Sequence, residues 1–349
     1  MKLVSAFLAV LVSGCLTQTP HPAAVIRDGT GAVLFLRFSP DGGELARICQ
    51  FGPVMLFDAN GYRKARTFSV GMRMVAYSPD GTRIATAEGT DGARVWSAAS
   101  GGQPMPKSIV DELSLLDAPL RVLQAPSQDP KQRVFWAEFS PDGKRLITTH
   151  ANGHVKVWNT SSWAIEEEIS LTAAEVRAAA FAPDGKTIVI GDTNGMLHQW
   201  SLATKTELQN LRTPDGAGAV TGVVFSPDAK TLVTTHQSPS ASSVMLWNTT
   251  GWIAQIESGF ASAAFSKDGK LLALGGRRIK LIDPSTWKQI RTIELPEMTL
   301  GESGRRFENQ PNANTRIPIS IGALAFSPDG RTLAVGSIDT TVRLVEMTQ

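Results

Sequence analysis

The chain has 349 residues and a nearly balanced charge, with 34 Lys and Arg against 32 Asp and Glu. No basic run or basic stripe occurs, which argues against a nucleic-acid partner. Only two cysteines are present, Cys15 and Cys49, too few for a disulfide framework.

Residues 1–14 are predicted to be a signal peptide. Lys2 precedes an apolar run, residues 3–12, that is too short to span a bilayer stably. Small residues stand directly before Cys15, which resembles the signal of a bacterial lipoprotein. The resemblance implies cleavage before Cys15, acylation of that residue, and a tether over residues 15–22. The alternatives are an ordinary signal peptide with a chance cysteine, or a core strand.

A five-residue pattern, Phe-Ser-Pro-Asp-Gly, recurs with small variations through the rest of the chain. Its aromatic residue occupies seven positions: Phe38, Tyr77, Phe139, Phe181, Phe225, Phe265 and Phe326. Neighbouring copies lie 39–44 residues apart, except for two spacings of 62 and 61 residues. This period predicts a repeat architecture with two insertions of about twenty residues each.

Each repeat is predicted to form four antiparallel strands. Pro presets a turn φ, Asp bonds its own backbone and Gly supplies a positive φ, so Pro-Asp-Gly is a tight reversal. Apolar runs on both sides of the turn, such as residues 220–225 and 231–235, predict a hairpin. In four repeats a third strand ends on tryptophan: Trp96, Trp158, Trp200 and Trp247. A short turn and a fourth strand follow, and four strands in about 42 residues predict one propeller blade.

The repeated turn and the tryptophan of the third strand resemble those of bacterial WD-repeat β-propellers. The resemblance covers residues 23–349 and implies an all-β, seven-bladed β-propeller in a single domain. The sequence departs from the family pattern because Trp-Asp never occurs, and only Phe57-Asp58 and Ile282-Asp283 keep the aspartate.

The N-terminal strand is expected to close the ring. The last repeat stops after its third strand, near residues 341–345, whereas residues 23–28 form one strand in excess before the first repeat. Because closure removes an unpaired strand edge, the excess strand is expected to complete the seventh blade.

The repeat alignment places both insertions between a fourth strand and the next first strand. In the second repeat the fourth strand is expected near residues 103–110, which leaves 111–133 as the insertion. In the sixth repeat it is expected near residues 287–294, which leaves 295–318. The family resemblance puts both insertions on the top face, where the turns between second and third strands emerge.

Polar residues recur eleven positions after the repeat aromatic, where the second strand meets the top turn. The column reads Cys49, Glu88, His150, Asp192, His236, Gly276 and Ser337. Its histidines and carboxylates are consistent with partner binding at the pore mouth, or with hydrogen bonding inside the blades. No metal site is predicted, because equivalent positions of adjacent blades lie more than one ligand length apart.

Arginines form a second group of candidate partner-binding residues. Arg73 and Arg177 each stand four residues before the repeat aromatic, and by family resemblance they point toward the top mouth. Arg277 lies in a top turn, and Arg305 lies in the second insertion. These guanidinium groups suit an acidic partner surface, and the alternative is ordinary surface charge.

The sequence contains no nucleophile elbow, phosphate loop, HExxH helix or CxxC pair. The expected function is a non-catalytic protein-binding scaffold of the bacterial cell envelope, anchored to a membrane through Cys15 on the periplasmic or surface side. We expect a monomer without cofactor or metal, with a protein or peptide partner on the top face. Two alternatives are a propeller hydrolase with polar residues at the pore mouth and a component of outer-membrane protein assembly.

Overall fold

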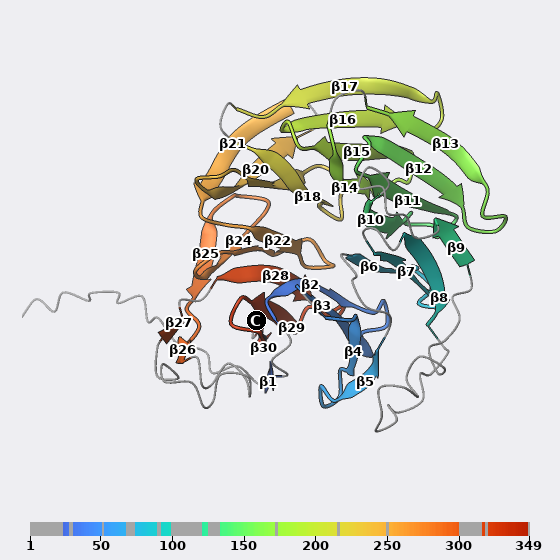
Figure 1. The fold of residues 1–349 in the computed structure, drawn as a ribbon. Coiled ribbons are helices and arrows are strands. Elements are labelled where there is room, and N and C mark those ends of the chain that lie inside the picture. Colours follow the sequence, from blue (N-terminus) through green and yellow to red (C-terminus); the bar gives the residue numbers. More distant parts are fainter. Residues whose placement is uncertain are drawn as a thin grey trace, which may run out of the picture.

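The computed structural model is an all-β ring of blades around a central channel (Figure 1). It describes residues 24–27, 31–50, 52–67, 74–88, 92–98, 121–124, 133–171, 174–214, 217–248, 251–299, 316–317 and 320–347. Within these ranges, no helix has the length and apolar character needed to cross a membrane. The insertions and the N-terminal residues before 24 lie largely or wholly outside the described residues.

Seven four-stranded antiparallel sheets form the blades. Blade 1 contains β2 (Val33–Phe38), β3 (Glu44–Cys49), β4 (Met55–Asp58) and β5 (Lys64–Thr67). Blade 2 contains β6 (Met74–Tyr77), β7 (Arg83–Ala87), β8 (Ala93–Ser97) and β9 (Arg121–Gln124). Blade 3 contains β10 (Val134–Phe139), β11 (Arg145–His150), β12 (His154–Asn159) and β13 (Ile165–Ser170).

The remaining blades follow the same order. Blade 4 contains β14 (Val176–Phe181), β15 (Thr187–Asp192), β16 (Met196–Ser201) and β17 (Thr206–Arg212). Blade 5 contains β18 (Ala219–Phe225), β19 (Leu232–Gln237), β20 (Ser242–Asn248) and β21 (Gly251–Ser258). Blade 6 contains β22 (Ser262–Phe265), β23 (Leu272–Gly275), β24 (Ile279–Ile282) and β25 (Gln289–Ile293). Blade 7 contains β28 (Ile321–Phe326), β29 (Thr332–Ser337), β30 (Thr341–Glu346) and β1 (Ala24–Arg27).

The core of the ring is divided among the blade interfaces. Seven buried apolar clusters are present among the described residues, and the buried members of each come from two neighbouring blades. Burying one large apolar side chain contributes about 1.5–3 kcal/mol, so each interface is a small core of its own. No blade can bury its apolar faces alone, which is why the ring folds as a unit.

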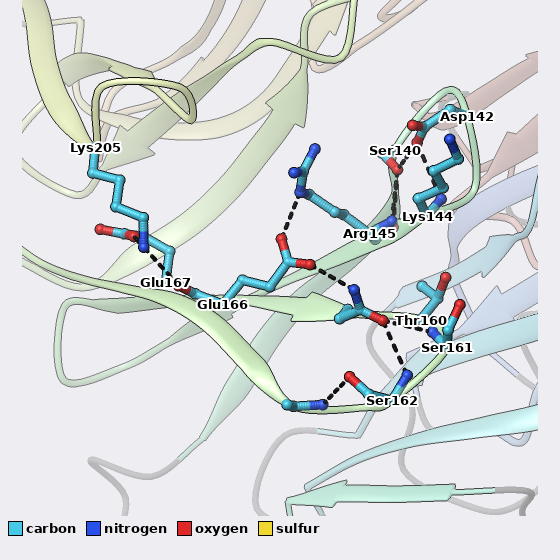
Figure 2. Close-up of polar contacts among 12 residues, drawn as sticks. Ser140, Asp142, Lys144, Arg145, Thr160, Ser161, Ser162, Glu166, Glu167 and Lys205 are labelled. Carbon is cyan, nitrogen blue, oxygen red and sulfur yellow. Dashed lines mark hydrogen bonds and ion pairs between the residues drawn. The ribbon is translucent and has the colours of Figure 1, made fainter.

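The Ser-Pro-Asp-Gly turns cap the bottom face in the way that the residue types predict. In blade 3, Ser140 Oγ donates to Asp142 Oδ1 at 2.6 Å, and the backbone N–H of Lys144 donates to the same oxygen at 3.0 Å (Figure 2). The hydroxyl of Ser140 holds the pKa of the Asp142 carboxyl below its usual value. Gly143 adopts a φ of 68°, the left-handed conformation that this turn requires.

Blades 3 and 4 are also joined by charged side chains at their outer edge. Within blade 3, Arg145 Nε and Glu166 Oε2 lie 2.7 Å apart, and Asn159 Nδ2 donates to Glu166 Oε1 at 2.7 Å. Lys205 of blade 4 reaches across to Glu167 Oε2 at 2.8 Å, as Figure 2 shows. Because the Lys205 side chain is exposed, this ion pair contributes at most about 1 kcal/mol and mainly fixes how the two edges meet.

The N-terminal strand closes the ring, as predicted. β1 pairs antiparallel with β30, with Ala24 opposite Leu344 and Arg27 opposite Thr341. Ile26 is buried in the cluster that blades 7 and 1 share. The two blades also meet at the bottom face, where a Cβ added to Gly42 would lie 3.3 Å from Pro328 Cδ.

The predicted position of the fourth strand in blade 2 was wrong. The strand is β9 at residues 121–124, inside the segment 111–133 that the repeat alignment assigned to the insertion, and it pairs with β8. The long segment therefore lies between the third and fourth strands. In blade 6, β25 falls within the predicted 287–294, but the predicted insertion 295–318 includes the buried Leu295 and the short pair β26 (Met298–Thr299) and β27 (Arg316–Ile317).

Candidate functional site

One residue near the start of the first strand stands out in nearly every blade, because the strand bulges there. The register with the second strand shifts at this residue in five blades: Leu34, Phe135, Arg177, Thr221 and Gly322. Ala261 holds the position in blade 6, just before β22. A bulge leaves one residue unpaired and redirects its side chain, so the fold repeats one display position around the channel.

These six residues line one cavity of about 510 Å³ at the top mouth of the channel. Blades 1, 3 and 4 contribute the large side chains of Leu34, Phe135 and Arg177. Blades 5, 6 and 7 contribute only small residues at the same position: Thr221, Ala261 and Gly322. The channel mouth is therefore lined by large, partly cationic side chains on the side of blades 1, 3 and 4. On the side of blades 5, 6 and 7 it is lined by small residues at this position.

The side with the large side chains is organised around Arg177. Its Nη2 lies 3.0 Å from Glu175 Oε2, and its guanidinium lies 5.7 Å from the centre of the Phe135 ring. Arg133 also lines the cavity, and its guanidinium makes no hydrogen bond or ion pair with the described residues. Leu34 is 49% exposed and completes an apolar and cationic surface open to solvent.

Below this mouth, aromatic side chains of blades 1 and 3 are in contact. Phe35 and Trp136 are in edge-to-face contact, with ring centroids 6.3 Å apart. Trp136 Nε1 donates to Glu138 Oε2 at 3.1 Å, and Glu138 Oε1 lies 3.6 Å from Arg37 Nη2. A second cavity of about 750 Å³ opens to the bottom face and shares Phe35 and Trp136 with the first.

The predicted polar column does not line either mouth. Glu88, His150, Asp192 and His236 are 1%, 1%, 4% and 1% exposed. Their side chains lie inside the blades, which favours the structural alternative over direct contact with a partner. The same burial removes the support for a hydrolase built from these four residues at the pore mouth.

In three blades a chain of hydrogen bonds, here called the relay, runs from the tryptophan of the third strand through a threonine of the second strand to a member of the column. These members are Glu88, His150 and His236. Trp158 Nε1 donates to Thr148 Oγ1 at 3.0 Å, and that oxygen lies 3.0 Å from His150 Nε2. Blade 5 repeats the arrangement with Trp247, Thr234 and His236, and blade 2 repeats it with Trp96, Thr86 and Glu88. Burial lowers the pKa of His150 to about 3 and that of His236 to about 4, so both imidazoles are neutral at pH 7.

The two carboxylates of the column also contact basic side chains of the third strand. Glu88 forms an ion pair with Arg94. Asp192 Oδ2 lies 3.3 Å from His198 Nε2, while its Oδ1 accepts backbone hydrogen bonds from Asn194 and Met196. These contacts join second and third strands within one blade, and they leave neither carboxylate available to solvent.

The predicted arginines are not all brought together. Arg177 lies at the channel mouth, whereas Arg277 is exposed on the turn between β23 and β24 and does not line the cavity. Arg73, Arg305 and Cys15 lie outside the described residues. Among the residues that are described, no group of three or more His, Cys, Asp or Glu side chains has the arrangement of a metal site.

Sequence reasoning identified the display position only where it holds an arginine. Leu34, Phe135 and Thr221 stand in the same column, four residues before the repeat aromatic, but their types carry no chemistry that marks a site. The signal that was available is the spacing, because each of these residues stands four positions before its repeat aromatic, whatever its type.

The fold and its repeats define a seven-bladed β-propeller with WD40 repeats. The family model described as "WD domain, G-beta repeat" matches residues 118–159, 168–201 and 318–346. Over 135 residues the chain is 30% identical to Protein LST8 homolog of Drosophila melanogaster. The aligned residues make up 38% of this chain and 39% of that protein. The match thus spans about two fifths of the relative's length. The WD40 propeller suggests a protein-interaction role.

Proposed function

We propose that the protein is a non-catalytic scaffold that holds a partner polypeptide at the top mouth of its channel. One observation carries the proposal: the position four residues before the repeat aromatic holds a different residue in each of six blades, and all six residues line one cavity. The blades share one four-stranded frame and a recurring bottom turn. Selection of one partner must depend on what differs among them.

The chemistry of the channel mouth suits an acidic and partly apolar partner segment. Leu34 and Phe135 offer apolar surface, and Arg133 offers a guanidinium without a partner among the described side chains. Arg177 is already oriented by Glu175 and Phe135, so little conformational freedom is lost when it binds.

Substitutions at the mouth are expected to remove partner capture without unfolding the ring. Phe135→Ala and Arg177→Glu should each lower recovery of co-purifying proteins from envelope extracts at least tenfold, measured by quantitative mass spectrometry. Lys186→Glu is the matched control, because Lys186 is exposed beside the bottom turn of blade 4 and keeps its backbone bond to Asp184. Loss of capture in the control and retention in both mouth variants would place the site on the other face.

We also propose that the scaffold is tethered to a membrane of the bacterial cell envelope by lipid on Cys15. The support is the sequence alone: an apolar run over residues 3–12 followed by small residues before the cysteine. A protein so anchored displays its ring near the membrane surface, through the polar tether of residues 15–22.

The variant Cys15→Ala is expected to lose acylation and to move from the membrane to the soluble fraction. The measurements are metabolic labelling with a palmitate analogue and fractionation of cells. Cys49→Ala is the matched control, because Cys49 is buried at the end of β3 and is closed to the acylating enzymes. A Cys15→Ala protein that stays with membranes as the wild type does would rule out the anchor.

A further inference from the structure

Six of the seven blade interfaces follow one packing rule. The third-strand residue just before the tryptophan position is aliphatic in six blades and lies in the same cluster as the tryptophan-position residue of the next blade. The six pairs are Leu56 with Trp96, Val95 with Trp158, Val157 with Trp200, Leu246 with Ile282, Leu281 with Val345, and Leu344 with Phe57. All six aliphatic members are buried.

Blade 4 breaks the rule with Gln199, which stands where the aliphatic residue would meet Trp247 of blade 5. A cavity of about 340 Å³ lies at this interface. Its apolar lining residues include Leu197, Trp247 and Phe225. A glutamine forfeits the packing that stabilises the other interfaces, so a structural role alone does not account for it.

A second glutamine faces the first. Gln209 of β17 is the direct cross-strand partner of Gln199 in β16, and both line the cavity. Neither side-chain amide forms a hydrogen bond with another described residue. Two neutral amides therefore converge on a partly apolar slot, and each can donate two hydrogen bonds and accept two.

We propose that this slot binds an extended peptide segment of a partner, with one bulky apolar side chain inserted between blades 4 and 5. The two glutamines hold the peptide groups that flank the inserted residue, because a peptide group presents the donor and acceptor that an amide complements. A volume of about 340 Å³ accommodates one large side chain and the adjoining backbone.

Charge and position favour a neutral, extended segment. The charged residues that line the slot are Asp184 and Lys230, one of each sign, from the bottom turns of blades 4 and 5. β17 is the outermost strand of blade 4, so the slot lies beside an open strand edge along which an extended chain can lie (Figure 1). This cavity between blades 4 and 5 is called the blade 4–5 slot below.

The blade 4–5 slot is separate from the channel mouth. The two cavities share no lining residue. Loss of binding at one site therefore does not imply loss at the other, and the slot does not depend on the function proposed for the mouth.

The test uses a phage-displayed library of random dodecapeptides, depleted on a Gln199→Leu variant and then selected on the wild-type protein. Leucine holds this position in four other blades, so Gln199→Leu should fold and melt at or above the wild-type temperature. Recovered peptides should share one bulky apolar residue in a proline-free segment. Synthetic copies should bind Gln199→Leu and Gln209→Leu at least tenfold more weakly than the wild type.

Two controls separate the slot from other surfaces. Gln289→Leu makes the same change on the exposed fourth strand of blade 6, and Arg177→Ala alters the channel mouth. Both should bind the peptides within twofold of the wild type. Failure to recover any peptide after depletion, or equal binding to Gln199→Leu, would overturn the proposal.

Discussion

A chain that begins at residue 29 is expected to melt about 10 °C below a chain that begins at residue 16. The shorter chain lacks β1, so β30 loses its antiparallel partner and the cluster between blades 7 and 1 loses Ile26. Removing a buried isoleucine side chain alone costs about 2–5 kcal/mol. The exposed edge of β30 adds to the loss, because its backbone groups then pair only with water.

A chain that begins at residue 22 is the matched control for this truncation. It removes most of the tether but keeps β1, and its melting temperature should equal that of the chain beginning at residue 16. Calorimetry on the three soluble chains makes the comparison. Equal melting temperatures for the chains beginning at residues 22 and 29 would contradict closure by the N-terminal strand.

The second large effect is a loss of stability, expected when Thr148 of β11 is replaced but not when the adjacent Thr149 is replaced. Thr148→Val should lower the free energy of unfolding by about 2–5 kcal/mol, because Trp158 Nε1 and His150 Nε2 both lose a buried hydrogen-bonding partner. Thr149→Val should be neutral or stabilising, because the buried Thr149 hydroxyl has no hydrogen-bond partner. Valine has nearly the same shape as threonine, so packing is preserved in both variants.

Urea denaturation measures the free energy of unfolding of both variants. The two variants carry the same chemical change at adjacent positions of one strand, so their difference isolates the hydrogen bonds of Thr148. The slope of the transition should stay the same, which would show that the ring still unfolds as one unit. Equal losses for the two variants would mean that the relay from Trp158 to His150 does not stabilise blade 3.

The repeat pattern predicted the architecture well because each blade obeys the same local chemistry. The Pro-Asp-Gly turn and the third-strand tryptophan recur with the strands that they delimit, and counting strands was enough to predict the pairing of β1 with β30. The same counting misplaced β9, because residues 99–120 contain no repeated signal that shows where the long segment ends.

The candidate site was harder to predict, because a polar residue at a strand end has the same appearance in sequence whether it faces solvent or a neighbouring strand. His150 and His236 were candidates for the pore mouth, yet both are buried beside a threonine of their own strand. A threonine two residues earlier, together with the third-strand tryptophan, is the signal that separates the two cases. Gln199 was also visible in the sequence as a polar exception, but its meaning depends on the interface that it faces.

The central claim is that the partner binds at the top mouth, and site-specific photo-crosslinking in cells tests it most directly. A benzophenone amino acid is placed at Leu34, which is 49% exposed beside the mouth cavity, or at Lys186 on the bottom face. The account predicts a discrete crosslinked adduct from position 34 that disappears in the Arg177→Glu background, and none from position 186. An adduct from position 186 with none from position 34 would contradict it.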